Sequence, residues 1–220
     1  MQLQQLPNIG LLKTLFVNLK CCSLKDALKM PILIARNVNV KYCRRKVFQF
    51  TDGVRPAMVT VGFNRHCNNG YRSTLSIQGK VIIHGRGIHA FGAGCFIHVG
   101  KKGIWEIGNN FGCTGDTRIT VSKRLIIGND NLWSYNNVVM DTDGHKILDS
   151  TTKERINNAR EVVFGDNVWM GCGCTILKGA TIPSGSVIAS RSIITKKIDG
   201  EHNIIGTQGK VIKENILWER

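Results

Sequence analysis

The sequence is poor in proline, in acidic residues and in long apolar runs. Only four of its 220 residues are Pro, and thirty Lys and Arg face fifteen Asp and Glu, which gives a net charge of +15. There is no run of about 18 uncharged apolar residues, so we expect no membrane-spanning helix. The first residues have no basic stretch before their short apolar segment, so we expect no secretory signal. The apolar share of 42% excludes an intrinsically disordered chain.

Short nucleic-acid-binding motifs are absent as well. The sequence has no paired CxxC motif with metal-ligand spacing, no aromatic ribonucleoprotein motif and no basic zipper. The positive charge therefore predicts anionic partners without indicating a nucleic acid. Nine Lys and Arg and a single Asp fall within residues 1–50, so this segment holds +8 of the total charge.

The cysteines are numerous but have no zinc-finger or zinc-ribbon spacing. We expect them to be small buried apolar side chains in a reducing, cytoplasmic compartment. Cys172 and Cys174 flank Gly173, and on an extended segment both would point to one face. A metal-binding or redox pair is the alternative there. The eight positions are Cys21, Cys22, Cys43, Cys67, Cys95, Cys113, Cys172 and Cys174.

A six-residue repeat runs through the C-terminal part of the chain. Six is neither a helical nor a plain strand period, but it suits a short strand followed by a corner. Bulky apolar residues recur at this period, and mostly small residues stand two positions before each. The bulky series is Phe164, Met170, Ile176, Ile182, Ile188 and Ile194, and the small series is Val162, Val168, Cys174, Ala180, Ser186 and Ser192.

This period predicts an all-β solenoid, a parallel β-helix of hexapeptide repeats. Three units form one coil of about eighteen residues, so Phe164 should stack on Ile182 and Met170 on Ile188. The many glycines suit the corners of such coils. The period continues upstream with phase shifts, through Ile107, Cys113 and Ile119, then Ile127, Trp133 and Val139, after a ragged beginning at Ile77 and Ile83.

Two segments depart from the repeat. Residues 140–162 form a polar insertion, and long loops on a rigid scaffold are usually functional. Residues 1–60 are expected to form a helical segment, residues 61–213 the β-helix and residues 214–220 a tail. Ser23 with Asp26 resembles a helix start, and Pro31 ends that helix. The apolar residues of the first helix, at helical spacing, are Leu11, Leu12, Leu15, Phe16 and Leu19.

The basic N-terminal helices have two possible roles. They cap the open first coil, as solenoids require. They also suit peripheral contact with an anionic membrane, at its inner face. The two roles are compatible.

The segments Val168–Lys196 and Gly206–Lys213 resemble the hexapeptide-repeat acyltransferases, most closely the branch of maltose, galactoside and surface-polysaccharide O-acetyltransferases. The resemblance covers roughly residues 75–213. It implies a left-handed β-helix with the N-terminal helical segment, a homotrimer, and acetyl-CoA as cosubstrate. It also implies a sugar or lipid-linked glycan as acceptor.

The resemblance implies that His145, in the motif DTDGH, is the general base. A neutral imidazole accepts the proton of the acceptor hydroxyl, which then attacks the thioester directly. A solvated loop histidine is the alternative. Asp141 and Asp143 either orient the imidazole and bind sugar or only form turns. Asp116 matches a substrate-contacting position loosely, and a corner residue is the simpler interpretation.

The same resemblance implies coenzyme A contacts in the last coils. Trp169 is alternatively an aromatic residue at a trimer face. Lys196, Lys197, Lys210 and Lys213 favour anion binding, although Gln208 and Lys197 depart from residues common in relatives. The implied contacts are Trp169, Cys172, Ser190, Thr195, Lys196 and Lys213.

The function predicted is therefore acetyl transfer from acetyl-CoA to a sugar hydroxyl in polysaccharide biosynthesis. An N-acetyltransferase for an amino sugar and a non-catalytic β-helix scaffold are the alternatives. One branch with this fold binds zinc through three histidines, which draws attention to His84, His89 and His98. The segment around them lacks the expected acidic and glutamine partners, so we expect no metal.

Overall fold

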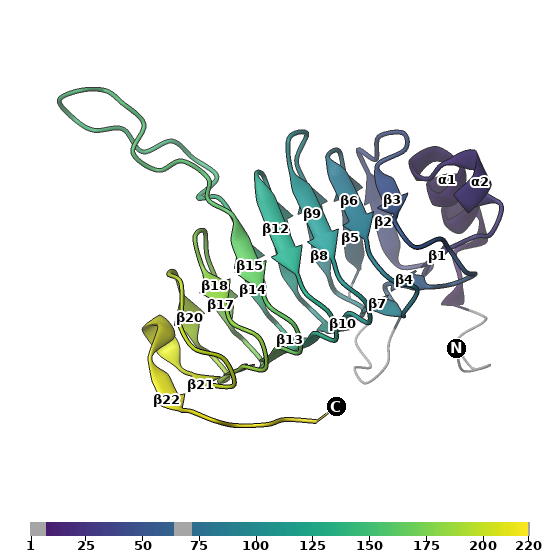
Figure 1. Cartoon of the computed structure of the whole chain (residues 1–220). Coiled ribbons are helices and arrows are strands. Elements are labelled where there is room, and N and C mark those ends of the chain that lie inside the picture. The colour runs from purple at the N-terminus through teal and green to yellow at the C-terminus, as the bar shows by residue number, and fades with distance from the viewer. Residues whose placement is uncertain (1–7, 64–71, 220) are drawn as a thin grey trace.

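The strands form three parallel sheets that wind around one axis. The computed structural model describes residues 8–63 and 72–219. Successive strands of the chain pass from a nine-stranded to a seven-stranded and then a six-stranded sheet, and the cycle repeats (Figure 1). We call the turn from the nine- to the seven-stranded sheet the first corner. The turn from the seven- to the six-stranded sheet is the second corner, and the return is the third.

The bounds of the strands follow this cycle. The nine-stranded sheet contains β1 (Ile32–Ile34), β4 (Val59–Val61), β7 (His89–Phe91), β10 (Gly112–Gly115), β13 (Leu132–Tyr135), β16 (Trp169–Met170), β19 (Val187–Ile188), β21 (Ile204–Ile205) and β22 (Val211–Lys213). The seven-stranded sheet contains β2 (Val38–Lys41), β5 (Ser73–Ile77), β8 (Phe96–Val99), β11 (Arg118–Val121), β14 (Val138–Met140), β17 (Thr175–Ile176) and β20 (Ile193–Ile194). The six-stranded sheet contains β3 (Phe48–Phe50), β6 (Lys80–Ile83), β9 (Ile104–Ile107), β12 (Arg124–Ile127), β15 (Val162–Phe164) and β18 (Thr181–Ile182).

The predicted β-helix and its register are confirmed. Phe164 pairs with Ile182 and Met170 with Ile188, as the eighteen-residue coil requires. Every bulky and small residue of the two series is buried. Upstream coils are longer because their strands and corners are longer. Ile107 therefore pairs with Ile127, which explains the phase shifts seen in the sequence.

Aromatic rings fill the centre of the solenoid. Phe111 lies between Phe91 and Trp133, with ring centroids 5.2 and 4.9 Å apart, and Trp133 lies 4.8 Å from Phe164. All four side chains are buried. Such edge-to-face and tilted pairs stabilise by about 1 kcal/mol each beyond the area they bury. They tie together three successive coils, β7–β9, β10–β12 and β13–β15.

Corners need small residues because the coils stack directly on one another. At the third corner a Cβ on Gly128 would lie 2.6 Å from the carbonyl of Gly165 in the next coil. Beside it, side-chain oxygens accept from backbone N–H groups of the neighbouring coil, Asn129 from Asn109 at 2.8 Å and Asp166 from Asn129 at 2.7 Å. The glycine excess of the sequence thus serves inter-coil packing.

The β-helix begins much earlier than predicted. β1 pairs with β4, β2 with β5 and β3 with β6, all in parallel. The boundary at residue 61 is therefore wrong, and the first coil starts at Ile32. The sequence did not reveal it because the corners between these strands vary in length, so no constant period connects them.

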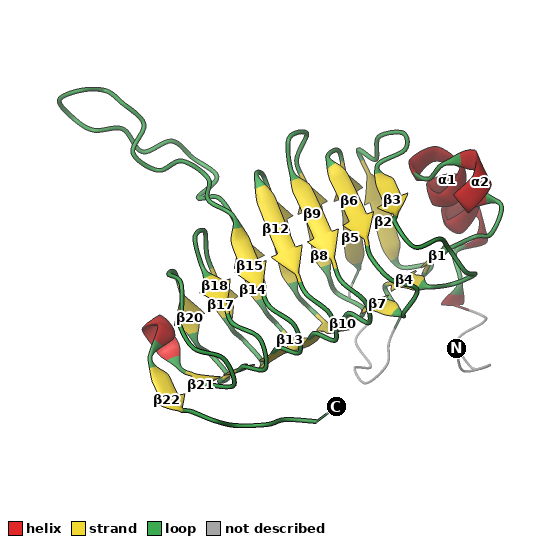
Figure 2. Ribbon diagram, in the orientation of Figure 1, coloured by secondary structure: helices red, strands yellow, loops and turns green. Residues whose placement is uncertain are grey.

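Two short helices cover the end of the first coil (Figure 2). They are α1 (Leu11–Cys21) and α2 (Leu24–Ala27). The predicted start of the second helix is confirmed, because the Ser23 side chain accepts from the backbone N–H of Asp26 at 3.2 Å. No helix in residues 8–63 and 72–219 is long and apolar enough to span a bilayer.

The apolar face of α1 does not pack against the coils, contrary to the usual meaning of an amphipathic pattern. Thr14, Val17, Asn18 and Cys21 are buried, whereas the predicted apolar residues are exposed. The reason is the free edge of β1. Its backbone groups need hydrogen-bond partners, and a polar helix face supplies them.

At the other end the chain reverses. β22 runs antiparallel to β21 after a short 3₁₀ helix, η2 (Thr207–Gly209). The tail then passes back along the nine-stranded sheet, where the Trp218 indole N–H donates to the carbonyl of Asn167 at 2.8 Å. The predicted final strand and tail are both present.

Candidate active site

The insertion after β14 projects from the second corner, away from the coils (Figure 1). Its neck is closed by a hydrogen bond of 3.1 Å from the backbone N–H of Arg160 to the carbonyl of Asp141. Farther out, Leu148 and Arg155 form an antiparallel bridge. The segment is therefore a two-legged arm with a defined base, which we call the arm.

Asp141 anchors the base of the arm. Its carboxylate accepts three backbone N–H groups from the preceding coil, those of Ser122, Lys123 and Arg124, at 2.6–2.8 Å. The side chain is 1% exposed, and this burial raises the pKa of Asp141 against the opposing effect of the three donors. A carboxylate in this position offers a substrate almost no surface, contrary to the predicted role in binding sugar.

Asn157 holds the segment that carries His145. Its amide nitrogen donates to the carbonyl of His145 and to the carboxylate of Asp143, both at 2.8 Å. Its amide oxygen accepts from the backbone N–H of Ile147 at 2.8 Å. One buried side chain thus fixes the backbone on both sides of His145.

Asp143 connects this segment to the coils. Besides Asn157, its carboxylate binds the ammonium of Lys178, which follows β17. The hydrogen bonds from Lys178 and then Asn157 lower the pKa of Asp143. Asp143 therefore orients the backbone around His145 through Asn157, and its two partners occupy the same carboxylate oxygen.

The imidazole of His145 is exposed on the arm. Within the described residues no hydrogen bond of its ring is found, so the ring is free to meet a ligand. The structure places it at the second corner, away from the nine-stranded sheet.

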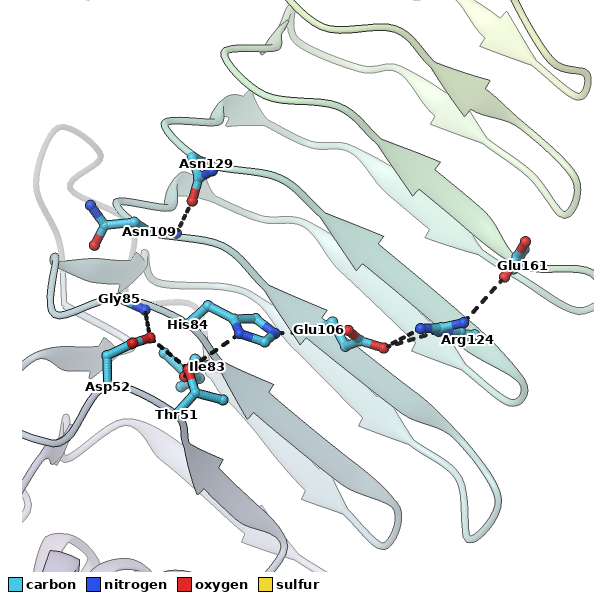
Figure 3. Close-up of polar contacts among 10 residues, drawn as sticks. All are labelled: Thr51, Asp52, Ile83, His84, Gly85, Glu106, Asn109, Arg124, Asn129 and Glu161. Carbon is cyan, nitrogen blue, oxygen red and sulfur yellow. Dashed lines mark hydrogen bonds and ion pairs between the residues drawn. The ribbon is translucent and has the colours of Figure 1, made fainter.

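Arg124 contacts both ends of the arm, and Figure 3 shows its guanidinium between Glu106 and Glu161. Its backbone N–H binds Asp141 where the arm leaves the coil. Its guanidinium binds Glu106 at 2.7 Å and lies 4.0 Å from Glu161, where the arm returns. Glu106 is in turn 3.8 Å from His84. This row of charges on the six-stranded sheet supports the base of the arm.

The residues predicted to contact coenzyme A are divided between two corners. Cys172 and Ser190 stack at the first corner, with Sγ and Oγ 3.5 Å apart. Trp169 lies on the adjoining nine-stranded sheet in one row with Lys213, through Val187 and Ile204. Trp169 is 42% exposed, and its ring centroid lies 6.0 Å from that of Trp218.

Thr195 and Lys196 lie at the second corner instead, directly after β20. Both are exposed. This is the corner from which the arm and Lys178 project. Asp116 belongs to the first corner, where its backbone N–H binds the carbonyl of Ala93 at 2.8 Å and its φ is +48°. Within one chain Asp116 is thus separated from the corner of His145, and its corner position agrees with the simpler interpretation.

The second corner is rich in cations. Most of its turns contain at least one Lys or Arg. Of the acids next to its strands, Asp141 is buried, Glu161 lies 4.0 Å from Arg124, and Asp199 pairs with Lys197 at 3.2 Å. We call this ridge the basic edge. Its exposed members are Arg44, Arg45, Lys46, Lys101, Lys102, Lys123, Lys196 and Lys197.

The solved structure of a polysialic acid O-acetyltransferase, OatWY, is similar in fold. It has a TM-score of 0.51 and 23% identity, over 84% of this chain and 88% of that one. The chain has the fold of the hexapeptide-repeat acetyltransferases. This is the left-handed parallel β-helix that the resemblance implied.

Two curated proteins are similar in sequence. The polysialic acid O-acetyltransferase of Escherichia coli O1:K1 is 41% identical over 102 residues, 46% of this chain and 33% of that protein. The enzyme of the same name from Neisseria meningitidis is 38% identical over 109 residues, 48% of this chain and 51% of that protein. The matches span about half the length of these relatives or less. No protein-family model matches the chain.

The described cysteines and the other histidines are mostly buried or bound to neighbouring side chains. Of the seven described cysteines, all but Cys172 are buried, and Cys67 lies outside the described residues. Cys174 is buried whereas Cys172 is partly exposed, and Gly173 between them has a φ of +69°. His98 binds Ser76 at 3.1 Å, His89 is fully buried, and in the described ranges no three metal-binding side chains gather.

Sequence reasoning missed the residues that position the arm. Lys178 and Arg124 lie on other coils, and the stacking of coils brings them to the arm. Asn157 lies on the arm itself, twelve residues after His145, and meets it because the two legs of the arm pair with each other. The basic edge was the one feature with a usable signal, because Lys and Arg recur in most turns of the second corner.

Proposed function

We propose that this chain is an acetyl-CoA-dependent O-acetyltransferase that modifies a sugar hydroxyl of a surface polysaccharide. The observation that carries the proposal is its similarity to two curated polysialic acid O-acetyltransferases. The left-handed β-helix and the arm with DTDGH support the same function.

His145 is the general base in this proposal. Its exposed ring has no competing partner among the described residues, so a ring nitrogen is free to accept the acceptor's proton. The hydroxyl oxygen then forms a bond to the thioester carbon, and the resulting oxyanion collapses with release of the thiol, which receives the proton from His145. Asn157 and Asp143 hold the backbone of His145 in place.

The surfaces suit coenzyme A, which supplies the acetyl thioester. Trp169 offers an exposed ring, and Lys196, Lys197, Lys210 and Lys213 lie on the last coils, where phosphates of a nucleotide need cations. Because these residues occupy two corners of one chain, we propose that the first corner of one subunit faces the second corner of another in a homotrimer. His145 then meets the cofactor across the subunit boundary.

The acceptor that fits best is an anionic polysaccharide. A polymer of sialic acid carries one carboxylate per sugar, and the basic edge presents cations in three of the four second-corner turns that precede the arm. A neutral sugar has no charge that could pair with these cations. The acceptor of this chain is therefore proposed to be a polymer with acidic sugars.

The test is release of free thiol from acetyl-CoA, with and without sialic acid polymer and a panel of neutral and amino sugars. We expect acceptor-dependent release by the wild type and a loss of at least about 100-fold in His145→Ala. His98→Ala is the control, since it removes a histidine of β8 whose ring binds Ser76. Release with amino sugars alone would indicate an N-acetyltransferase. No release with any acceptor would indicate a non-catalytic scaffold. Full activity of His145→Ala would show that His145 is not the general base. Light scattering that gives three copies of the 24.4 kDa chain supports the trimer.

A further inference from the structure

The helices at the first coil expose an apolar surface that their packing does not use. Five apolar residues of α1 and two in or next to α2 are 47–84% exposed. On a helix with about 100° per residue those of α1 span an arc of about 140°. We call this surface the apolar helix face; its members are Leu11, Leu12, Leu15, Phe16, Leu19, Leu24 and Leu28.

The opposite face of α1 caps the first coil. Asn18 and Thr14 form hydrogen bonds of 2.7–3.3 Å with both backbone groups of Ile32 and Ile34 in the edge strand. Lys13 donates to the carbonyls of Arg36 and Val38, both at 2.7 Å. The cap is therefore complete without the leucines, and exposing them to water is a cost that folding does not explain.

Cations border the apolar helix face. The ammonium of Lys20 lies 4.9 Å from the ring centroid of Phe16. A shallow hollow of about 500 Å³ is lined by Leu19 and Leu24 together with Lys20, Arg45 and Lys46. The single acid of the segment, Asp26, is engaged by the hydroxyl of Ser23 at 2.7 Å. Leucines and cations in one hollow are complementary to a phospholipid, whose acyl chain lies beside its phosphate.

We propose that the apolar helix face docks on an anionic phospholipid membrane. The leucines and Phe16 enter the boundary between headgroups and acyl chains, and Lys20, Arg45 and Lys46 meet lipid phosphates. Charge selects lipid over a second copy of the chain, because two such ends, each with +8 in residues 1–50, repel one another. The proposal does not depend on the enzymatic activity.

The experiment is co-sedimentation of the full chain with vesicles of phosphatidylcholine, alone or with about a third of phosphatidylglycerol, at low and high salt. We expect binding to the anionic vesicles only, weakened by salt. Leu12→Ser/Leu15→Ser/Phe16→Ser should abolish it, and Arg45→Ala/Lys46→Ala should weaken it about 30-fold.

Two control variants remove the same types of side chain, cationic and apolar, at other places on the surface. Arg86→Ala/Arg118→Ala removes two exposed cations elsewhere, and Ile212→Ser/Leu217→Ser removes exposed apolar side chains at the other end. Both should bind vesicles like the wild type. The substituted side chains are exposed, so thermal midpoints should stay unchanged, which separates lost binding from lost folding.

Depth is measured independently with Phe16→Trp. Brominated acyl chains should quench the added fluorescence relative to the wild type. Three results overturn the proposal: no binding to anionic vesicles, equal binding to neutral ones, or self-association that disappears in the serine variant and identifies a second copy as the partner. Failure of vesicle binding with intact acetyl transfer to soluble acceptor would refute this inference alone.

Discussion

The side-chain amide of Asn18 makes the two hydrogen bonds with Ile32 that a neighbouring β-strand would make. Its nitrogen donates to the Ile32 carbonyl at 2.7 Å, and its oxygen accepts from the Ile32 N–H at 3.1 Å. Both residues are fully buried. A polar side chain thus terminates the nine-stranded sheet, and the open edge that would recruit another strand is closed.

Replacing this amide should destabilise the first coil. Asn18→Leu leaves a buried donor and a buried acceptor of Ile32 unpaired, and each costs about 1–3 kcal/mol. We expect the free energy of unfolding to fall by about 2–4 kcal/mol, measured by denaturant titration. Asn39→Leu, at an exposed position of β2, is the control. Equal stability of the two variants would contradict the capping role.

Asn157 should act on the rate through the position of His145. Asn157→Ala removes the donor to the His145 carbonyl and the acceptor for Ile147. Misplacement of a base by about 1 Å costs up to about 100-fold, so we expect kcat to fall by about 10- to 100-fold while KM for acetyl-CoA stays unchanged. Hydrogen exchange of residues 143–157 should rise in the same variant.

Two further variants separate positioning from a general loss of structure. Asn157→Asp keeps the acceptor for Ile147 but has no donor for His145 and places a second charge beside Asp143, so it should not restore kcat. Glu154→Ala, at an exposed place on the same arm, should leave kcat as in the wild type. An unchanged kcat in Asn157→Ala would show that the arm holds His145 without it.

The sequence predicted the solenoid because its core repeats. Phe164 and Ile182 had to be apolar and eighteen residues apart, and nothing else suits that pattern. Asn18 and Asn157 carry no such signal, since each acts through contacts with a strand or a carbonyl whose position depends on the completed fold. The leucines of α1 show the limit of a periodic pattern. The pattern predicted the helix correctly. It could not predict which face is buried, because that depends on the unpaired edge of β1.

His89 should make stability depend on pH. It is fully buried, and within the described residues neither ring nitrogen has a hydrogen-bond partner. Burial, and then the charge of Arg55, lowers the pKa of His89 from 6.5 to about 4. Between these values the unfolded chain binds a proton that the folded chain does not, so stability is present above about pH 6.5 and is lost as the pH falls towards 4.

The size of this effect follows from the shift in pKa, about 3 kcal/mol between pH 6.5 and 4. His89→Leu should remove that part of the pH dependence in urea titrations and raise stability at low pH. His98→Leu, which removes a partly exposed histidine, should keep the dependence of the wild type. Parallel pH profiles of His89→Leu and the wild type would show that another group is responsible.

The basic edge should matter for long acceptors and not for short ones. Lys101 and Lys102 lie in the turn between β8 and β9, on the same corner as the arm but on other coils. A sialic acid polymer that lies along the edge reaches them, whereas a single sugar at His145 does not. We expect Lys101→Ala/Lys102→Ala to raise KM for the polymer by about 10-fold at low salt and to leave KM for acetyl-CoA unchanged.

Salt and acceptor length distinguish this explanation from a loss of overall charge. Exposed charges farther apart than the Debye length, about 8 Å at physiological ionic strength, are largely screened. The effect of the double variant should therefore shrink as salt rises and vanish with a sialic acid monomer. Arg86→Ala/Arg118→Ala loses the same charge outside the second corner, so its KM for the polymer should change little. If both double variants raise that KM equally, the net charge of the chain attracts the polymer and the basic edge has no directing role.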